Sequence, residues 1–212
     1  MRDIPELVEG YRSFRATHYH RQVETYRLLA ERGQTPRTMI IACSDSRVDP
    51  ATIFSAGPGQ LFVVRNVANL VPPFEPHGDY HGTSAAIEFA VTNLRVENIV
   101  VMGHGRCGGI AASLAELYEP PAPNSFIGNW ITLARAARSE VIQSGPTLSS
   151  EDRQRALEHT AIRYSIENLK TFPFVRDKVE SGALRLRGAY FDIFSGDLLA
   201  LDERKAAFDK VT

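Results

Sequence analysis

Two short segments of the sequence carry side chains that could hold a metal ion and act on what it binds. In the first, residues 43–47 (C-S-D-S-R), a thiol, a carboxylate and a guanidinium occupy alternate positions. If this segment is extended, Cys43, Asp45 and Arg47 project to the same side. A lone cysteine followed by charged residues is more often a core residue beside a surface ion pair. The second segment decides between these interpretations.

The second segment, residues 103–109 (G-H-G-R-C-G-G), adds an imidazole and another thiol. His104 and Cys107 are three residues apart on a glycine-rich turn that opens a predicted helix, so both can converge on one ion. The helix N-terminus lowers the pKa of the thiol toward the thiolate that metals require. Together with Cys43 they give two thiolates and one imidazole, which leaves one tetrahedral position free for water. This is the donor set of a catalytic zinc site.

The glycines of the second segment also match the fingerprint of a dinucleotide site. Gly103, Gly105 and Gly108 spell G-x-G-x-x-G between a predicted strand and a predicted helix. That alternative requires a further strand about 20 residues on, ending in an acidic residue for the ribose. Residues 119–123 in that region are proline-rich instead, and the variable positions of the fingerprint hold a histidine and a cysteine. Nucleotide binding is therefore the second choice.

The other histidines have simpler interpretations. His18 and His20 flank a tyrosine on a predicted helix, where positions two apart do not face each other, so we expect both at the surface. His159, on another predicted helix, is expected there too. Residues 77–81 (H-G-D-Y-H) alternate polar side chains in a long loop, which are more often solvated than metal-binding. None of these residues is assigned to a site.

Three short apolar runs predict the strands that position both segments. Residues 39–42, 61–64 and 99–102 have the composition of buried parallel strands. An apolar helix face over 83–95 lies between the last two, which is a βαβ pattern. Residues 43–47 and 103–109 each follow a strand directly. In a parallel sheet both then open onto the carboxyl edge, where α/β proteins place their ligands.

The remaining elements are mostly helical. Apolar residues at three- and four-residue spacing predict one or two amphipathic helices over 5–32, ending at Gly33. Further helices are expected from residue 108, over 126–143 and over 150–170. The last strand, 184–194, ends at a turn signal and is compatible with an edge position.

Composition limits the classes of function. The 212 residues are 43 % hydrophobic and suit a single α/β domain spanning 1–212. The 24 basic and 25 acidic residues leave a net charge of -1 without a basic excess, so nucleic acid and membranes are not expected as partners. Neither a secretory signal nor an apolar run of about 18 residues occurs, which predicts a cytoplasmic protein. Two distant cysteines are too few for a disulfide scaffold.

Three motifs resemble those of the β-class carbonic anhydrases, and specifically their plant-like (type I) subgroup. These are C-S-D-S-R at 43–47, V-R-N-V-A-N at 64–69 and G-H-x-x-C-G-G at 103–109, within a similarity that extends from about residue 34 to 201. The resemblance implies an α/β fold with four parallel strands, an antiparallel edge strand and flanking helices. It also implies a homodimer, or a larger even-numbered homo-oligomer, in which residues 1–33 form a dimerisation arm.

The resemblance further implies the reversible hydration of carbon dioxide to bicarbonate and a proton, by attack of a zinc-bound hydroxide. Cys43, His104 and Cys107 then hold the Zn²⁺, and Asp45 and Arg47 form the catalytic pair. Asp45 is expected to accept a hydrogen bond from the zinc ligand that attacks carbon dioxide. Arg47 is expected to keep the Asp45 carboxylate from swinging onto the zinc.

The substrate residues of the family also have counterparts in this sequence. Gln34, nine residues before the first zinc cysteine, is expected to donate to a substrate oxygen. Phe62, Val67 and Phe89 are expected to form the apolar wall of the cleft, and the N–H of Gly108 to place a bicarbonate oxygen. Phe89 departs from the tyrosine of plant relatives. Hydrolysis of carbonyl sulfide or carbon disulfide on the same zinc, and a non-catalytic zinc-binding regulator, are the alternative functions.

A second bicarbonate pocket, found in another branch of the family, is not expected. That pocket uses a Trp, an Arg and a Tyr. The arginine is present as Arg65, but Ile40 stands at the tryptophan position and Phe191 at the tyrosine position. A slip of one residue would place Tyr190 there instead. The lost donors predict an open site at neutral pH, with Asp45 paired to Arg47.

Overall fold

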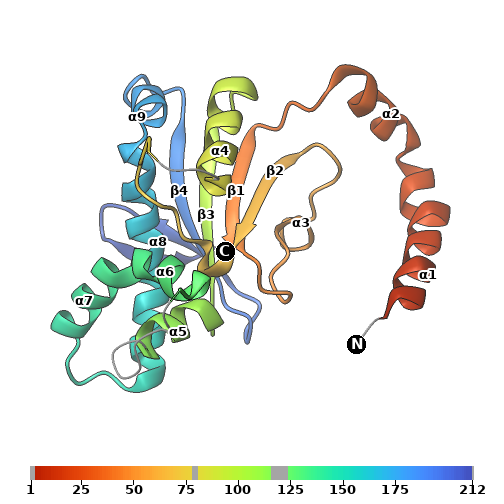
Figure 1. Ribbon diagram of the computed structural model, residues 1–212. Coiled ribbons are helices and arrows are strands. Elements are labelled where there is room, and N and C mark those ends of the chain that lie inside the picture. Colours follow the sequence, from red (N-terminus) through yellow and green to blue (C-terminus); the bar gives the residue numbers. More distant parts are fainter. Residues whose placement is uncertain (1–2, 78–80, 116–123, 212) are drawn as a thin grey trace.

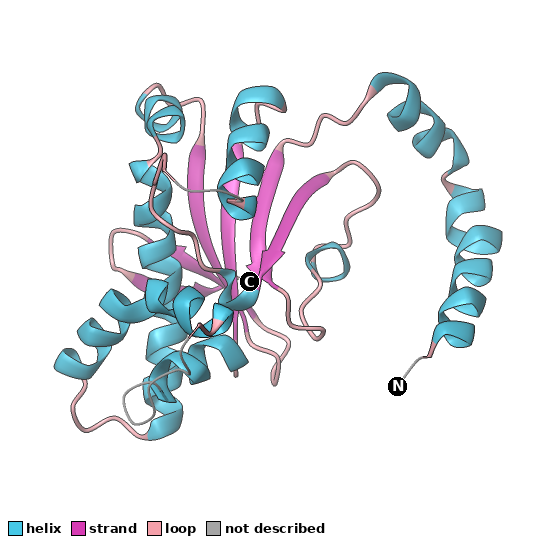
Figure 2. Ribbon diagram, in the orientation of Figure 1, coloured by secondary structure: helices cyan, strands magenta, loops and turns pink. Residues whose placement is uncertain are grey.

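The computed structural model describes residues 3–77, 81–115 and 124–211. Its centre is a six-stranded sheet in the order β2-β1-β3-β4-β5-β6 (Figure 1 and Figure 2). The strands are β1 (Thr38–Cys43), β2 (Leu61–Asn66), β3 (Asn98–His104), β4 (Arg185–Phe191), β5 (Leu198–Asp202) and β6 (Ala207–Lys210). The first four are parallel, and the last two are antiparallel to their neighbours. The mostly parallel α/β fold is therefore confirmed.

The end of the sheet differs in two details from the expectation. β4 is an interior strand, paired with β3 on one side and β5 on the other, so its edge position is corrected. Its alternation is weak because consecutive residues near its end are buried. β6 is a sixth strand that the pattern did not predict, since Phe208 is the one large apolar residue within it and packs against the main core.

Helices cover one face of the sheet much more completely than the other. The main core cluster joins β1, β3 and β4 to residues of three helices, α4 (Gly82–Glu88), α8 (Ser150–Thr171) and α9 (Pro173–Glu180). On the other face a small cluster of Ile40, Ala42, Met102 and Ala189 packs against three strand residues, Leu61, Val100 and Leu198, and against Ile53 of the short helix α3 (Pro50–Ile53). Val63 of β2, two positions from Leu61 and so on the same face, is 38% exposed, so part of this face is open to solvent.

The other helices lie near the carboxyl ends of the parallel strands. They are α5 (Gly108–Ala115), α6 (Phe126–Ile131) and α7 (Arg135–Ser144), beside α8 in Figure 1. A π-helical turn, Phe89–Asn93, continues α4 and completes the helix expected over 83–95. The whole proline-rich segment, residues 119–123, and Asp79 in the long loop lie outside the described residues.

The N-terminal helices stand apart from the rest of the chain. α1 (Ile4–Phe14) and α2 (Val23–Arg32) are joined through a π-helical turn, Arg15–Tyr19, and none of the three contains a buried residue. The arm arches away from the sheet in Figure 1. It ends, as predicted, at Gly33, whose φ of 78° favours glycine.

Candidate metal centre

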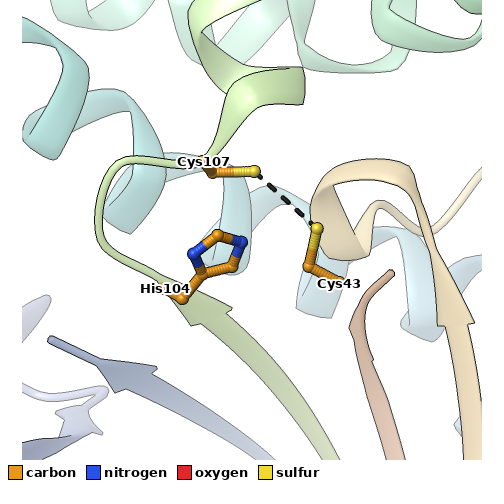
Figure 3. Close-up of side chains that lie close together, drawn as sticks. All are labelled: Cys43, His104 and Cys107. Atoms are coloured by element: carbon orange, nitrogen blue, oxygen red, sulfur yellow. Dashed lines mark hydrogen bonds between the residues drawn. The ribbon is translucent and has the colours of Figure 1, made fainter. Parts of the chain in front are cut away.

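The structure brings the three predicted metal ligands together. Cys43 is the last residue of β1 and His104 the last residue of β3, which is its parallel neighbour. Cys107 lies on the turn that follows, just before α5. The ligand atoms of the three residues all lie within 4.8 Å of one another, and all three side chains are buried. Figure 3 shows the imidazole beside the two sulfurs.

His104 presents a free nitrogen to this cluster. Its Nδ1 lies 2.9 Å from the carbonyl oxygen of Gly105, and because a carbonyl can only accept, Nδ1 carries the proton and donates. Nε2 is then left with its lone pair, buried and without a hydrogen-bond partner. A buried nitrogen without a partner is costly unless a cation fills the place of the donor. The geometry fits a metal ligated through Nε2.

The two thiols need a cation to be ionised together. Their sulfurs are 3.9 Å apart, so they are free thiols and not a disulfide. The hydrogen bond with Cys107 lowers the pKa of the Cys43 thiol. The hydrogen bond to Cys43, followed by burial, raises the pKa of the Cys107 thiol. Only one sulfur is readily ionised on its own, whereas a divalent ion between them would hold both as thiolates.

A strained turn after β2 supports the Cys43 sulfur. The backbone N–H of Ala68 donates to Cys43 Sγ at 3.4 Å. Ala68 and Asn69 have φ values of 64° and 48°, a conformation that residues other than glycine rarely adopt. Trp130 Nε1 donates to the carbonyl of Val67 at 2.7 Å and holds the turn in place. Sequence reasoning missed Trp130, because it lies 63 residues from its partner.

The turn also requires a glycine opposite it. A Cβ at Gly109 would lie 2.7 Å from Val67 Cγ1 and 2.9 Å from the Cβ of Ala68. Two of the three glycines of the dinucleotide fingerprint have packing roles of the same kind. A Cβ at Gly103 would lie 2.7 Å from the side chain of Ile162, and one at Gly105 would lie 3.0 Å from Tyr190 Oη. These contacts explain Gly103 and Gly105 without a nucleotide, whereas a Cβ at Gly108 would meet no atom within 4 Å.

Asp45 and Arg47 form a two-pronged ion pair next to the ligands. Arg47 Nε and Nη2 donate to the two Asp45 oxygens at 2.9 and 2.7 Å. These bonds hold the pKa of Asp45 well below its usual range. Asp45 Oδ2 also lies 3.9 Å from His104 Nε2. The segment is a tight turn rather than an extended strand, since Asp45 Oδ1 accepts the backbone N–H of Arg47 at 2.9 Å.

Arg65 supports the same turn from β2. Its Nε donates to the carbonyl of Cys43 at 2.8 Å, and its Nη2 to the carbonyl of Asp45 at 2.6 Å. The guanidinium therefore holds the backbone of the ligand loop. Tyr190 lies on the face of the sheet covered by α8, where its hydroxyl donates to Glu158 at 2.9 Å. It does not supply the phenol that a one-residue slip would have placed near Arg65.

The predicted substrate residues fall into two groups. Val67 and Gly108 lie near the cluster, in the supporting turn and at the start of α5. Gln34 precedes β1, and Phe62 pairs with Met39 near the start of that strand. Cys43 follows Met39 by four positions, so the two residues are about 13 Å apart along the strand at ~3.3 Å per residue.

Phe62 lies beside Phe89, with 5.8 Å between the ring centres. Phe89 is thus placed, with Gln34 and Phe62, toward the amino end of the strands. These three residues are not brought to the metal cluster of their own chain.

One prediction about the histidines is wrong. His18 and His20 are exposed, as expected. His159 is half-buried rather than exposed: its ring lies 4.4 Å from the rings of both Tyr190 and Phe208, and its Nε2 is buried without a partner. Burial and the charge of Arg155 lower the pKa of His159 to about 4. Helix periodicity could not reveal this, because β6 supplies one wall of the site.

Comparison with known sequences points to one family. The profile of the family described as "Carbonic anhydrase" matches residues 38–198. Beta carbonic anhydrase 3 of Arabidopsis thaliana is 38% identical over 202 residues, covering 94% of this chain and 78% of that protein. Mitochondrial beta carbonic anhydrase 6 of the same plant is 36% identical over 190 residues, covering 90% of this chain and 64% of that protein.

Solved structures agree with the sequences. The β-carbonic anhydrase CcaA has a TM-score of 0.89 at 31% identity, with 98% of this chain and 99% of that chain covered. A tetrameric β-carbonic anhydrase of Sordaria macrospora has a TM-score of 0.81 at 28% identity, with 92% and 94% covered. The chain therefore belongs to the β-class carbonic anhydrases, lyases that hydrate carbon dioxide. Among the described residues, no helix combines the length and apolarity needed to cross a membrane.

Proposed function

We propose that this chain catalyses the reversible hydration of carbon dioxide to bicarbonate and a proton with a zinc ion held by Cys43, His104 and Cys107. The observation that carries this proposal is the buried, unpartnered Nε2 of His104 facing two thiols. Two thiolates and a neutral imidazole are a zinc donor set, with a fourth position open to water. When bound, zinc supplies an acidified water as the nucleophile.

Asp45 and Arg47 would prepare the nucleophile for attack. The Asp45 carboxylate sits beside the ligand cluster and can accept a hydrogen bond from the water, which directs a lone pair of the oxygen at the carbon of carbon dioxide. Both oxygens of Asp45 are engaged by Arg47. This pairing keeps the carboxylate as a hydrogen-bond acceptor and opposes its movement onto the metal.

A second copy of the chain would complete the substrate cleft. Gln34, Phe62 and Phe89 lie at the other end of the strands from their own ligand cluster, so a role at the zinc places them in the site of a partner. The exposed apolar residues of the arm, together with the exposed Val63 of β2, supply surface for such a partner. A tetrameric relative is consistent with an even-numbered homo-oligomer. The cytoplasmic location stays a prediction.

Two measurements on the full chain test this function. Metal analysis should give one zinc per chain, and stopped-flow assays should show carbon dioxide hydration that a chelator abolishes and zinc restores. Zinc without hydration would favour the regulator. Faster turnover of carbonyl sulfide or carbon disulfide than of carbon dioxide would favour the alternative hydrolase. Absence of zinc from the active protein would overturn the assignment of the ligands.

A further inference from the structure

A buried carboxylate lies directly behind Cys107. Glu158 of α8 is 3% exposed, and its Oε1 accepts a hydrogen bond from the backbone N–H of Cys107 at 2.9 Å. Gln154 Nε2 donates to the same oxygen at 3.0 Å. Tyr190 Oη donates to Oε2 at 2.9 Å. One side chain thus ties α8 and β4 to the backbone of a proposed zinc ligand.

The donors around Glu158 are neutral. Within residues 3–77, 81–115 and 124–211, the hydrogen bonds to its carboxylate come from a peptide, an amide and a phenol, and no basic side chain forms an ion pair with it. Burial and the charge of Glu158 raise the pKa of Tyr190, which keeps the phenol protonated as a donor. Burying a carboxylate without a cation costs several kcal/mol in general. A neutral glutamine would avoid that cost.

The surroundings of Cys107 supply the missing positive charge. Cys107 immediately precedes α5, so the carboxylate accepts a peptide N–H at the positive end of that helix. The sulfur of the same residue would hold the cation. A buried negative charge next to Cys107 strengthens the binding of a cation there, because few mobile ions screen it.

We propose that Glu158 is a positioning residue of the zinc centre. Its hydrogen bond fixes the peptide of Cys107, and through it the sulfur that lies 3.9 Å from the Cys43 sulfur. Its charge favours the metal ion at the ligand cluster. Sequence motifs do not reveal this role, because Glu158 lies 51 residues from Cys107. The inference rests on the zinc site of the proposed function.

Three substitutions distinguish the effect of the Glu158 charge on the metal site from its effect on folding. Glu158→Gln keeps an oxygen for the Cys107 N–H but removes the charge, whereas Glu158→Asp keeps the charge and shortens the side chain. Glu167→Gln is the matched control, an exposed carboxylate on the same helix that pairs with Lys170. Zinc affinity is measured by competition with a chelator. The sulfur-to-metal absorption band of the cobalt-substituted protein reports the geometry of the thiolates.

The expected result is a zinc affinity 10–100-fold weaker in Glu158→Gln, with a shifted cobalt band. Glu158→Asp should recover part of the affinity, and Glu167→Gln should match the wild type. A folded Glu158→Gln protein with wild-type affinity and spectrum would overturn the role of Glu158. If that variant does not fold, Tyr190→Phe removes one bond to the carboxylate, and an unchanged cobalt band there would also overturn it. A wild-type protein without zinc affinity would instead overturn the proposed function.

Discussion

The carboxyl ends of β1 and β3 differ from the N-terminal arm in burial and in support from the rest of the chain. At the strand ends, Cys43, His104 and Cys107 are buried, and hydrogen bonds join the loops around them to β2, to the turn that follows β2 and to α8. The arm has no buried residue, and Ile4 and Leu7 are 76% and 57% exposed. The metal ligands and the residues that support them all come from one chain, whereas the arm presents an apolar face with no core to join.

This contrast separates what a substitution should change in each region. Changes at the strand ends should alter metal content and chemistry within a folded chain. Changes in the arm should alter assembly first. Five experiments test that division, beginning with the largest expected effect.

Removal of a ligand sulfur should have the largest effect. Cys107→Ser is expected to lose zinc and all measurable carbon dioxide hydration, because a neutral hydroxyl is a poor substitute for a thiolate. Metal analysis after gel filtration and a stopped-flow assay provide the measurements. Ser113→Ala, a buried small residue on α5 beyond the ligand turn, is the control and should keep its zinc. Full zinc occupancy in Cys107→Ser would refute the ligand assignment.

Loss of the ion pair beside the ligands should slow the reaction without releasing the metal. Asp45→Asn and Arg47→Ala are expected to retain zinc but to hydrate carbon dioxide about 100-fold more slowly. In the first variant the acceptor loses its charge, and in the second the carboxylate is released from its two-pronged contact. Zinc content and turnover are measured on the same sample. Near-normal turnover in either protein would contradict the proposed roles.

The sequence predicted this end of the sheet well because its chemistry is local. Each motif directly follows an apolar run, and parallel strands bring their carboxyl ends together. The supporting residues were not predictable in the same way. Trp130 and Glu158 contact the ligand loops only through the folding of distant segments, and no motif marks them. Arg65 stands in the V-R-N-V-A-N motif, but its hydrogen bonds to the carbonyls of Cys43 and Asp45 were not predicted. β6 was missed for a related reason, since a short strand with one large apolar residue gives no periodicity.

The arm should determine assembly rather than the metal site. Deletion of residues 1–30 is expected to yield monomer or aggregate, because it removes the apolar face of α1 that would pack against a partner subunit. Leu7→Glu is a finer change that should weaken the same contact. Arg12→Ala, which removes only an exposed ion pair, should leave assembly unchanged. Sedimentation velocity measures each species, and a soluble, active dimer of the truncated chain would be inconsistent with this role.

His159 provides a smaller test of a region completed by its own chain. Its pKa of about 4 lies below the ordinary value of 6.5, so the folded state keeps the ring neutral while the unfolded state takes up a proton as the pH falls. The resulting stability is fully present above pH 6.5 and is lost toward pH 4. Between pH 7 and pH 5 the free energy of unfolding should therefore fall by about 1–2 kcal/mol less in His159→Phe than in the wild type.

Urea unfolding at both pH values measures this difference. Protonation of the metal ligands destabilises both proteins equally, so it cancels in the comparison. At pH 8 the ring is neutral in both states, and the pH dependence of the two proteins should coincide there. Parallel stability curves between pH 7 and pH 5 would show that the burial of His159 has no influence on acid stability.

The smallest expected effect concerns bicarbonate, which should not close the site. A bicarbonate beside Arg65 would lose hydration without gaining an indole or phenol donor, because Ile40 and Phe191 offer none and Tyr190 donates to Glu158 on the helical face. Arg65 is itself engaged by the carbonyls of Cys43 and Asp45. The rate of carbon dioxide hydration should then depend on pH through a single ionisation near pH 7. Added bicarbonate should not inhibit it cooperatively. A steep, bicarbonate-dependent loss of activity below about pH 8 would mean that Asp45 leaves Arg47 and that the ligand loop is less fixed than its hydrogen bonds indicate.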